Sequence, residues 1–90
     1  MRRGGECEGA LVPRYFFNLY DDVNTLDEEG IQLRDQATAE AFGLTNARAI
    51  AADQVRQGKL ALWHRIEVAD ESGELLKTIR FADAVEIEHG

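Results

Sequence analysis

The chain of 90 residues contains a single cysteine, Cys7, which excludes an intrachain disulfide and any metal site built on paired thiolates. Sparse cysteine is typical of proteins in reducing compartments, so we expect a cytoplasmic protein. Long hydrophobic runs are also missing. The apolar run nearest the N-terminus, Ala10 to Val12, is too short for the core of a signal peptide or for a membrane span. We therefore expect no membrane contact.

Positive charge is scarce in this sequence. Ten lysine and arginine residues stand against 17 aspartate and glutamate residues, and the formal net charge is −7. Nucleic acids are bound largely through clustered Lys and Arg that neutralise phosphates, so this balance argues against nucleic acid as a partner. The remaining composition, 44% hydrophobic and 30% charged, is that of a soluble domain with one small core.

Catalytic and cofactor signatures are absent from the sequence. It has no glycine-rich phosphate loop and no His-Glu-x-x-His motif, and neither His64 nor His89 has a serine or cysteine partner in a recognisable motif. The acidic stretch from Asp21 to Glu29 could attract a hard cation such as Ca²⁺, but it lacks the Asp-x-Asp-x-Asp-Gly spacing and fits a solvated turn. We expect no enzyme, no cofactor and no metal site.

Turn and cap residues divide the chain into few pieces. Residues 1–12 hold three glycines and no apolar periodicity, so we expect a disordered extension followed by one domain over residues 13–90. Asp35 as N-cap and Gly58 just past the C-terminus predict a helix over residues 35–57. We expect a kink or break at Gly43, because an interior glycine costs about 1 kcal/mol relative to alanine.

The apolar residues of this helix fall on one broad half of its wheel, and we expect that half to lie on a sheet. These residues are Ala37, Ala41, Leu44, Ala47, Ile50, Ala51 and Val55. Arg48 lies near the middle of the same half, where it could extend outward or pair with Asp27 or Glu28. Phe42 lies outside this half, and we expect it to be the one large side chain of the helix free for an exposed contact.

Two hairpins flank the helix in this interpretation. In the first, a strand over residues 14–20 returns between Thr25 and Leu33, with turn chemistry and a positive φ at Gly30. In the second, strands over residues 63–69 and 75–81 flank a polar turn at residues 70–74. Residues 83–88 offer a short last element, either an edge strand or a helical turn, with Val85 and Ile87 buried. The fold predicted is α+β, β-β-α-β-β, an antiparallel sheet with one main helix on one face.

The first strand has apolar side chains on both faces. Side chains alternate along a strand, so Tyr15, Phe17 and Leu19 line one face while Phe16 and Tyr20 emerge on the other. One small domain has a single core, so the second face is expected to meet another molecule. The residues expected on this interaction surface are Phe16, Tyr20, Trp63, Arg65 and Arg80, with Phe42 as an alternative contact.

Several segments together resemble a family of short bacterial proteins known only as a domain of unknown function. The resemblance covers residues 13 to about 87 and implies no activity. The segments are Pro13-Arg14-Tyr15-Phe16-Phe17-Asn18-Leu19, Asp27-Glu28-Glu29-Gly30, the alanine-rich helix, Arg65-Ile66-Glu67-Val68 with Asp70-Glu71-Ser72-Gly73, and Phe81-Ala82-Asp83-Ala84-Val85. Members of that family typically begin Met-Pro-Arg-Tyr-Phe, and Val12 stands here in place of that methionine. The resemblance therefore implies that translation starts at Val12.

A second resemblance, mostly topological, is to HicB-type antitoxins, whose small domain also runs from a strand hairpin into an alanine-rich helix. This chain lacks the DNA-binding segment that follows in those proteins. We expect a noncatalytic interaction or regulatory module that forms a homodimer or binds another protein. The alternatives are an antitoxin-like partner, an RNA-binding sheet that stacks bases on its aromatic residues, and a small hydrolase.

Overall fold

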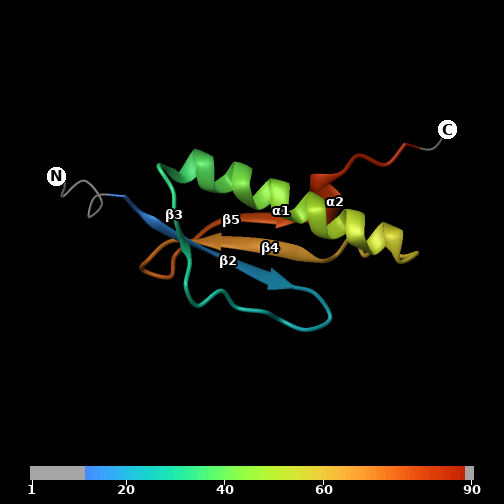
Figure 1. Cartoon of the computed structure of the whole chain (residues 1–90), viewed down its shortest axis with the longest axis horizontal. Coiled ribbons are helices and arrows are strands. Elements are labelled where there is room, and N and C mark those ends of the chain that lie inside the picture. Colours follow the sequence, from blue (N-terminus) through green and yellow to red (C-terminus); the bar gives the residue numbers. More distant parts are fainter. Residues whose placement is uncertain (1–11, 89–90) are drawn as a thin grey trace.

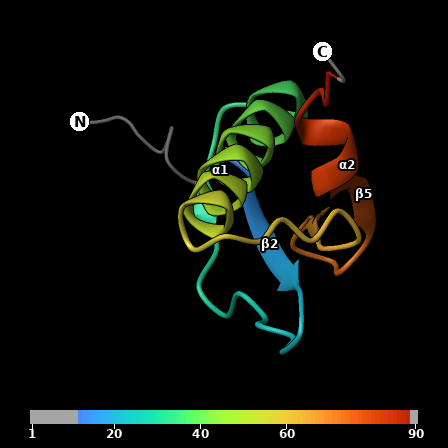
Figure 2. The same ribbon diagram turned by 90° about the vertical axis from the view of Figure 1, so that its right-hand side faces the viewer.

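The computed structural model describes residues 12–88 and contains one four-stranded antiparallel sheet with the strand order β3-β2-β4-β5. Both helices lie on the same side of this sheet (Figures 1 and 2). The elements are β2 (Arg14–Tyr20), β3 (Ile31–Gln32), α1 (Gln36–Arg56), β4 (Arg65–Ala69), β5 (Leu75–Arg80) and α2 (Phe81–Ala84). The predicted α+β fold, β-β-α-β-β with one main helix, is confirmed. The predicted N-terminal extension lies outside the described residues, apart from Val12.

Helix α1 begins and ends at the residues that the sequence indicates. The Asp35 carboxylate accepts a hydrogen bond from the Thr38 N–H at 2.8 Å, which satisfies one of the free donors of the first turn. At the other end, the Gly58 N–H donates to the Val55 carbonyl, and Gly58 has a φ of 95°. A glycine takes this left-handed conformation without a steric penalty, so the chain can leave the helix there.

The face of α1 that packs on the sheet differs from the predicted one. Ala39, Gly43, Ala47 and Ala51 are buried, and Leu44 and Ile50 pack partly against the core. The predicted members Ala37, Ala41 and Val55 are exposed instead, so the prediction was wrong for them. Alanine occurs on several sides of this helix, and its position on the wheel therefore indicates the buried side only weakly. Arg48 is exposed, in line with the first of its two predicted alternatives, and its Nε donates to the Ala84 carbonyl at 2.7 Å instead of pairing with Asp27 or Glu28.

Gly43 marks the closest approach of α1 to the sheet. The helix continues through this residue, so the predicted break is absent. A Cβ atom built on Gly43 would lie 2.8 Å from Ile79 Cδ1 and 3.3 Å from Val68 Cγ2. The glycine therefore provides space for two sheet side chains, which is a packing role and not a helix-ending one.

Alternation along the strands directs one set of side chains toward α1. Tyr15, Ile66, Val68 and Ile79 are buried there, and Phe17 and Leu19 pack against them. The predicted assignment of the odd-numbered β2 residues to the core is thus confirmed. Phe81 is fully buried and opens α2, so the last element begins two residues earlier than predicted. Val85 packs against the core as expected, whereas Ile87 is 47% exposed.

Strand β5 carries an irregularity at its start. Val68 pairs with Lys77, but the next residue, Ala69, pairs with Leu75, so Leu76 is an extra residue in β5. Because of the bulge, Leu75 lies on the opposite face of β5 from Lys77 and Ile79, and it is 51% exposed. Trp63 precedes β4 in a turn instead of beginning the strand.

Candidate interaction face

The side of the sheet that faces away from α1 is called the outer face here. The strand registers arrange its side chains in three cross-strand rows, each with one residue from β2, β4 and β5. The rows are Phe16–Ala69–Leu75, Asn18–Glu67–Thr78 and Tyr20–Arg65–Arg80. Within residues 12–88, neither helix covers this face (Figure 1).

The first row is apolar, and two of its members, Phe16 and Ala69, border a shallow groove of about 360 Å³. Phe16 and Ala69 line the groove together with Leu26, which the connection between β2 and β3 contributes. Leu26 is 59% exposed and Leu75 is 51% exposed. Large aliphatic side chains with this exposure, grouped beside an aromatic ring, are typical of surfaces that bind another protein.

The third row combines an aromatic ring with two arginines. The Arg65 guanidinium lies 4.5 Å from the centre of the Tyr20 ring, a cation–π contact, and its Nε donates to Glu67 at 3.0 Å. Arg80 is more exposed and lies 3.7 Å from Asp83. Arg65 is therefore held in place by its neighbours, while the Arg80 side chain can reorient toward a partner.

The connection between β2 and β3 is organised by Asp27. Its carboxylate accepts hydrogen bonds from three backbone N–H groups, those of Phe17, Glu29 and Gly30. Partial burial by itself would raise the pKa of Asp27, but these three hydrogen bonds, that from Gly30 first, bring the pKa below its usual value. The Asp27 N–H in turn donates to the Asn18 side chain at 2.8 Å.

Asp70 organises the turn between β4 and β5 in a similar way. It accepts hydrogen bonds from the Ser72 hydroxyl and from the Ser72 and Glu74 N–H groups. The Ser72 hydroxyl, followed by the Glu74 N–H, holds the pKa of Asp70 below its usual value. Both Asp27 and Asp70 are thus charged at neutral pH. Together with the exposed Glu28 and Glu71, they form the wall of the groove, which is called the acidic rim here.

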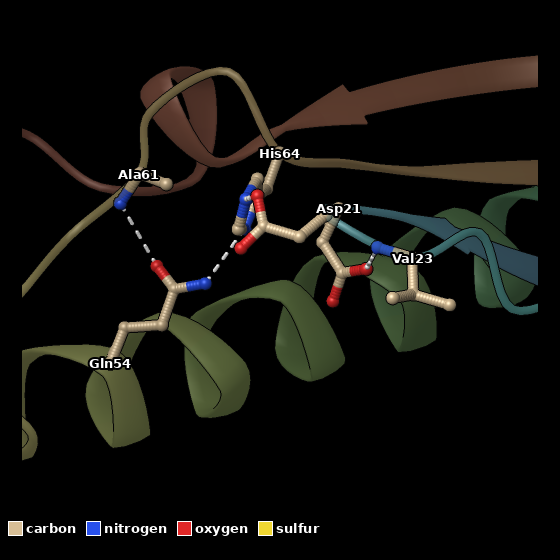
Figure 3. Close-up of polar contacts among 6 residues, drawn as sticks. Asp21, Val23, Gln54, Ala61 and His64 are labelled. Carbon is tan, nitrogen blue, oxygen red and sulfur yellow. Dashed lines mark hydrogen bonds and ion pairs between the residues drawn. The ribbon is translucent and has the colours of Figure 1, made fainter.

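Among the described residues, His64 is the one polar side chain that is buried in the core. It lies on the helix side of the sheet (Figure 3). The Gln54 Oε1 accepts from the Ala61 N–H, so the Gln54 Nε2 donates to His64 Nδ1 at 2.8 Å. The neutral ring then carries its proton on Nε2. This atom is buried without a hydrogen-bond partner, and the nearest Asp22 oxygen lies 3.8 Å away.

The surroundings of His64 are those of a packed core residue. Its ring packs edge-on against Trp63 and Phe81. His64 is 4% exposed and belongs to the core of the described residues. The distance of 3.8 Å from Nε2 to the Asp22 carboxylate is too long for a hydrogen bond.

The structure brings four of the six predicted surface residues to the outer face. Phe16, Tyr20, Arg65 and Arg80 lie there in two of the three rows. Trp63 is 57% exposed in the turn before β4, where its ring lies against His64. Phe42 lies on the other side of the sheet, with its ring centre 5.0 Å from that of Phe17.

Sequence reasoning missed Leu26, Ala69 and Leu75. Leu26 is a lone apolar residue in an acidic stretch, and an isolated leucine gives no periodicity to place it. Leu75 reaches the outer face because of the bulge at Leu76, which has no sequence signature of its own. Pairing the two strands of the second hairpin around Gly73 could have found Ala69.

Two structural findings concern other classes of function. Across residues 12–88, no three His, Cys, Asp or Glu side chains gather closely enough to hold a metal ion. In the same part of the chain, neither helix combines the length and the apolar character that crossing a membrane requires.

Comparison with known proteins gives one match. The profile of the family described as Domain of unknown function (DUF6894) matches residues 14–82. No curated protein and no solved structure matches the chain.

Proposed function

The chain belongs to this family of unknown function, and we propose that it acts as a noncatalytic protein-interaction module that forms a homodimer through its outer face. The observation that carries the proposal is the apolar row Phe16–Ala69–Leu75, which lies with Leu26 on a sheet face that no described helix covers. The single cysteine, Cys7, supports a reducing compartment such as the cytoplasm as the place of this function.

The size and chemistry of the outer face favour a weak, reversible complex. Strands of 7, 2, 5 and 6 residues, with a rise of about 3.3 Å per residue and a spacing of about 4.8 Å, give a flat area of roughly 300 Å². Stable complexes bury about 800 Å² on each partner, so we expect a dissociation constant in the micromolar range or above. The polar middle row, with Glu67 at its centre, is consistent with a protein that also exists as a monomer.

The other candidate partners fit this face less well. An RNA-binding sheet needs free cations next to stacking rings, but Arg65 is already paired with Glu67 and the acidic rim borders the same face. A catalytic role needs a positioned nucleophile or an acid–base pair, and the buried His64 is hydrogen-bonded to Gln54. Binding of a different protein through the same apolar row remains an outcome of the test.

The proposal is tested by a matched pair of substitutions. Leu26 and Val55 are both 59% exposed, but Leu26 lies at the outer face and Val55 lies on α1. We expect Leu26→Asp to weaken self-association about tenfold or more, because it places a charge in the apolar contact, and Val55→Asp to leave it unchanged. Sedimentation equilibrium from about 1 to 500 μM measures both, and circular dichroism checks that each variant is folded.

A monomer at every concentration would contradict the homodimer. A dimer that Val55→Asp weakens as much as Leu26→Asp would contradict the outer face as its site. The double variant Phe16→Asp and Tyr20→Asp is a second probe of the same face, since both side chains belong to its rows.

A further inference from the structure

We infer that two copies of this chain pair their outer faces in an end-to-end orientation, with the Tyr20–Arg65–Arg80 row of each copy over the acidic rim of the other. This inference rests on the proposed function and adds the geometry and the specificity of the contact. Its basis is the unequal distribution of charge between the two ends of one sheet face.

The two ends of the outer face carry opposite charges. The acidic rim, with Glu71 as its most accessible part in the β4–β5 turn, borders the Phe16 end. Arg65 and Arg80 lie at the Tyr20 end. Four residues separate Phe16 from Tyr20, which is about 13 Å along a strand. This distance exceeds the electrostatic screening length of about 8 Å at physiological ionic strength. The charges at the two ends of the face therefore interact with a partner independently of each other.

On the outer face Glu67 pairs with Arg65, so Arg80 supplies the cation that is left for a partner. The Arg80–Asp83 pair spans 3.7 Å between two largely exposed side chains, and such surface ion pairs contribute little. Asp83 lines a second groove between α1 and β5, on the helix side. Asp22 approaches the buried His64, which also lies on the helix side, and Asp21 accepts a hydrogen bond from the Val23 N–H of its own loop. Arg14 belongs to the opposite end, but its guanidinium donates to the carbonyls of Glu29 and Gly30.

A two-fold axis in the plane of the interface allows two simple pairings. If the axis runs along the strands, each row faces itself, so the two arginine rows meet at one end and the two acidic rims meet at the other. If the axis runs across the strands, along the Asn18–Glu67–Thr78 row, the ends exchange and Arg80 of one copy meets Glu71 of the other. Glu67, at the centre of the middle row, faces its own copy in both pairings and does not distinguish them. Like charges facing each other suppress an orientation, and opposite charges favour it. The charge distribution therefore selects the second pairing.

The apolar contact is compatible with this orientation. In the end-to-end pairing each strand faces its own copy, so Phe16 of one chain faces Tyr20 of the other and Leu75 faces the aliphatic part of Arg80. Arginine side chains cover apolar surface with their methylene groups while their guanidinium groups reach carboxylates. A chain of net charge −7 is repelled by its own copy at long range, so this local complementarity is required for a dimer.

The inference is tested by reversing one charge at a time. Arg80→Glu and Glu71→Arg are each expected to weaken the homodimer about tenfold or more, since each variant places like charges at both ends of the interface. Lys77→Glu is the matched control for Arg80→Glu, because Lys77 is on the same strand but pairs with Val68 on the helix side. We expect Lys77→Glu to leave the dissociation constant within about twofold.

Restoring the charges tests the orientation itself. Mixing the Arg80→Glu chain with the Glu71→Arg chain creates heterodimers in which both ends are again complementary, and we expect their affinity to approach that of the original homodimer. The chain that carries both substitutions is expected to self-associate in the same way.

The possible outcomes separate the two proposals. A wild-type chain that stays monomeric would contradict the homodimer and this inference together. A homodimer that Leu26→Asp disrupts, but that neither single charge reversal weakens, would leave the proposed function in place and overturn the end-to-end orientation. Single reversals that weaken the dimer without recovery in the mixture would also overturn it.

Discussion

The Asp27 carboxylate accepts a backbone hydrogen bond from β2 that the carbonyl of a neighbouring strand would otherwise accept. Thr25 pairs with Leu19, and pairing resumes at Ile31 with Tyr15, so between these two points β2 pairs with β4 but has no described strand partner along its β3 edge. The Phe17 N–H lies in that interval and donates to the Asp27 carboxylate instead. Charged acceptors form stronger hydrogen bonds than neutral ones, and the depressed pKa of Asp27 keeps this acceptor charged at neutral pH.

The role of Asp27 predicts a pH dependence of stability. Its pKa is lower in the folded chain than in the unfolded chain, so its contribution is present above the unfolded value of about 4 and is lost as the pH falls through the folded pKa. In Asp27→Asn an amide N–H₂ faces the Phe17 N–H, and we expect a loss of about 1 to 2 kcal/mol at pH 7. Urea denaturation at pH 7 and pH 3 measures this.

The control for this prediction is a comparison of the stability difference between wild type and Asp27→Asn at the two pH values. The gap in stability between wild type and Asp27→Asn is expected to narrow at pH 3, because this pH lies below the unfolded pKa of about 4, where the contribution of the charged carboxylate begins to be lost. An equal gap at both pH values would show that the charge of Asp27 does not contribute to stability.

At the scale of the helix, Gly43 determines how closely α1 approaches the sheet. Replacement by alanine improves helix propensity by about 1 kcal/mol but places a Cβ atom 2.8 Å from Ile79 Cδ1. Overpacking a filled core costs typically 1 to 3 kcal/mol, because neighbouring side chains leave their preferred rotamers. At this position the gain in helix propensity from alanine is therefore opposed by the cost of overpacking the core.

We expect the cost of overpacking to exceed the gain in helix propensity, so that Gly43→Ala lowers the free energy of unfolding by about 1 kcal/mol. The pure propensity effect is measured separately by Ala49→Gly, at an exposed position of the same helix. Adding the propensity difference from Ala49→Gly to the loss in Gly43→Ala gives the packing cost. An increase in stability for Gly43→Ala would contradict the close packing of α1 on Ile79 and Val68.

The same helix shows where prediction from sequence succeeds and where it fails. Its ends follow from Asp35 and Gly58, because capping depends on local chemistry that a single residue reveals. Its buried face does not follow, because Ala37 and Ala39 are equally small and apolar. Only the large sheet side chains beneath Gly43 decide which of them is buried, and that contact joins residues far apart in the sequence.

The candidate face was predictable to a similar extent. Alternation along β2 places Phe16 and Tyr20 on the outer face from the sequence alone, and alternation along the second hairpin does the same for Arg65 and Arg80. Their combination into rows depends on strand order and register. The acidic rim depends in addition on two turns that meet only in the folded chain, which no local pattern indicates.

For the whole molecule, burial is one-sided: α1 covers one face of the sheet, and no described helix covers the other. A four-stranded sheet with a single helix layer has a limited core, and so a second copy on the outer face would add apolar burial. A ligand or partner that binds only the folded state raises its apparent stability by mass action. Dimerisation is therefore expected to be visible in the melting temperature.

We expect the melting temperature of the wild-type chain to rise with protein concentration. At about ten times the dissociation constant, the added stability is about 1.4 kcal/mol, which corresponds to roughly 5 to 10 °C for a domain of this size. Leu26→Asp is expected to melt at a temperature that does not depend on concentration, whereas Val55→Asp is expected to behave as the wild type. Differential scanning calorimetry between about 10 and 500 μM measures all three. A wild-type melting temperature that stays constant over this range would mean that folding and self-association are not coupled, since mass action requires a shift whenever the dimer forms only from folded chains.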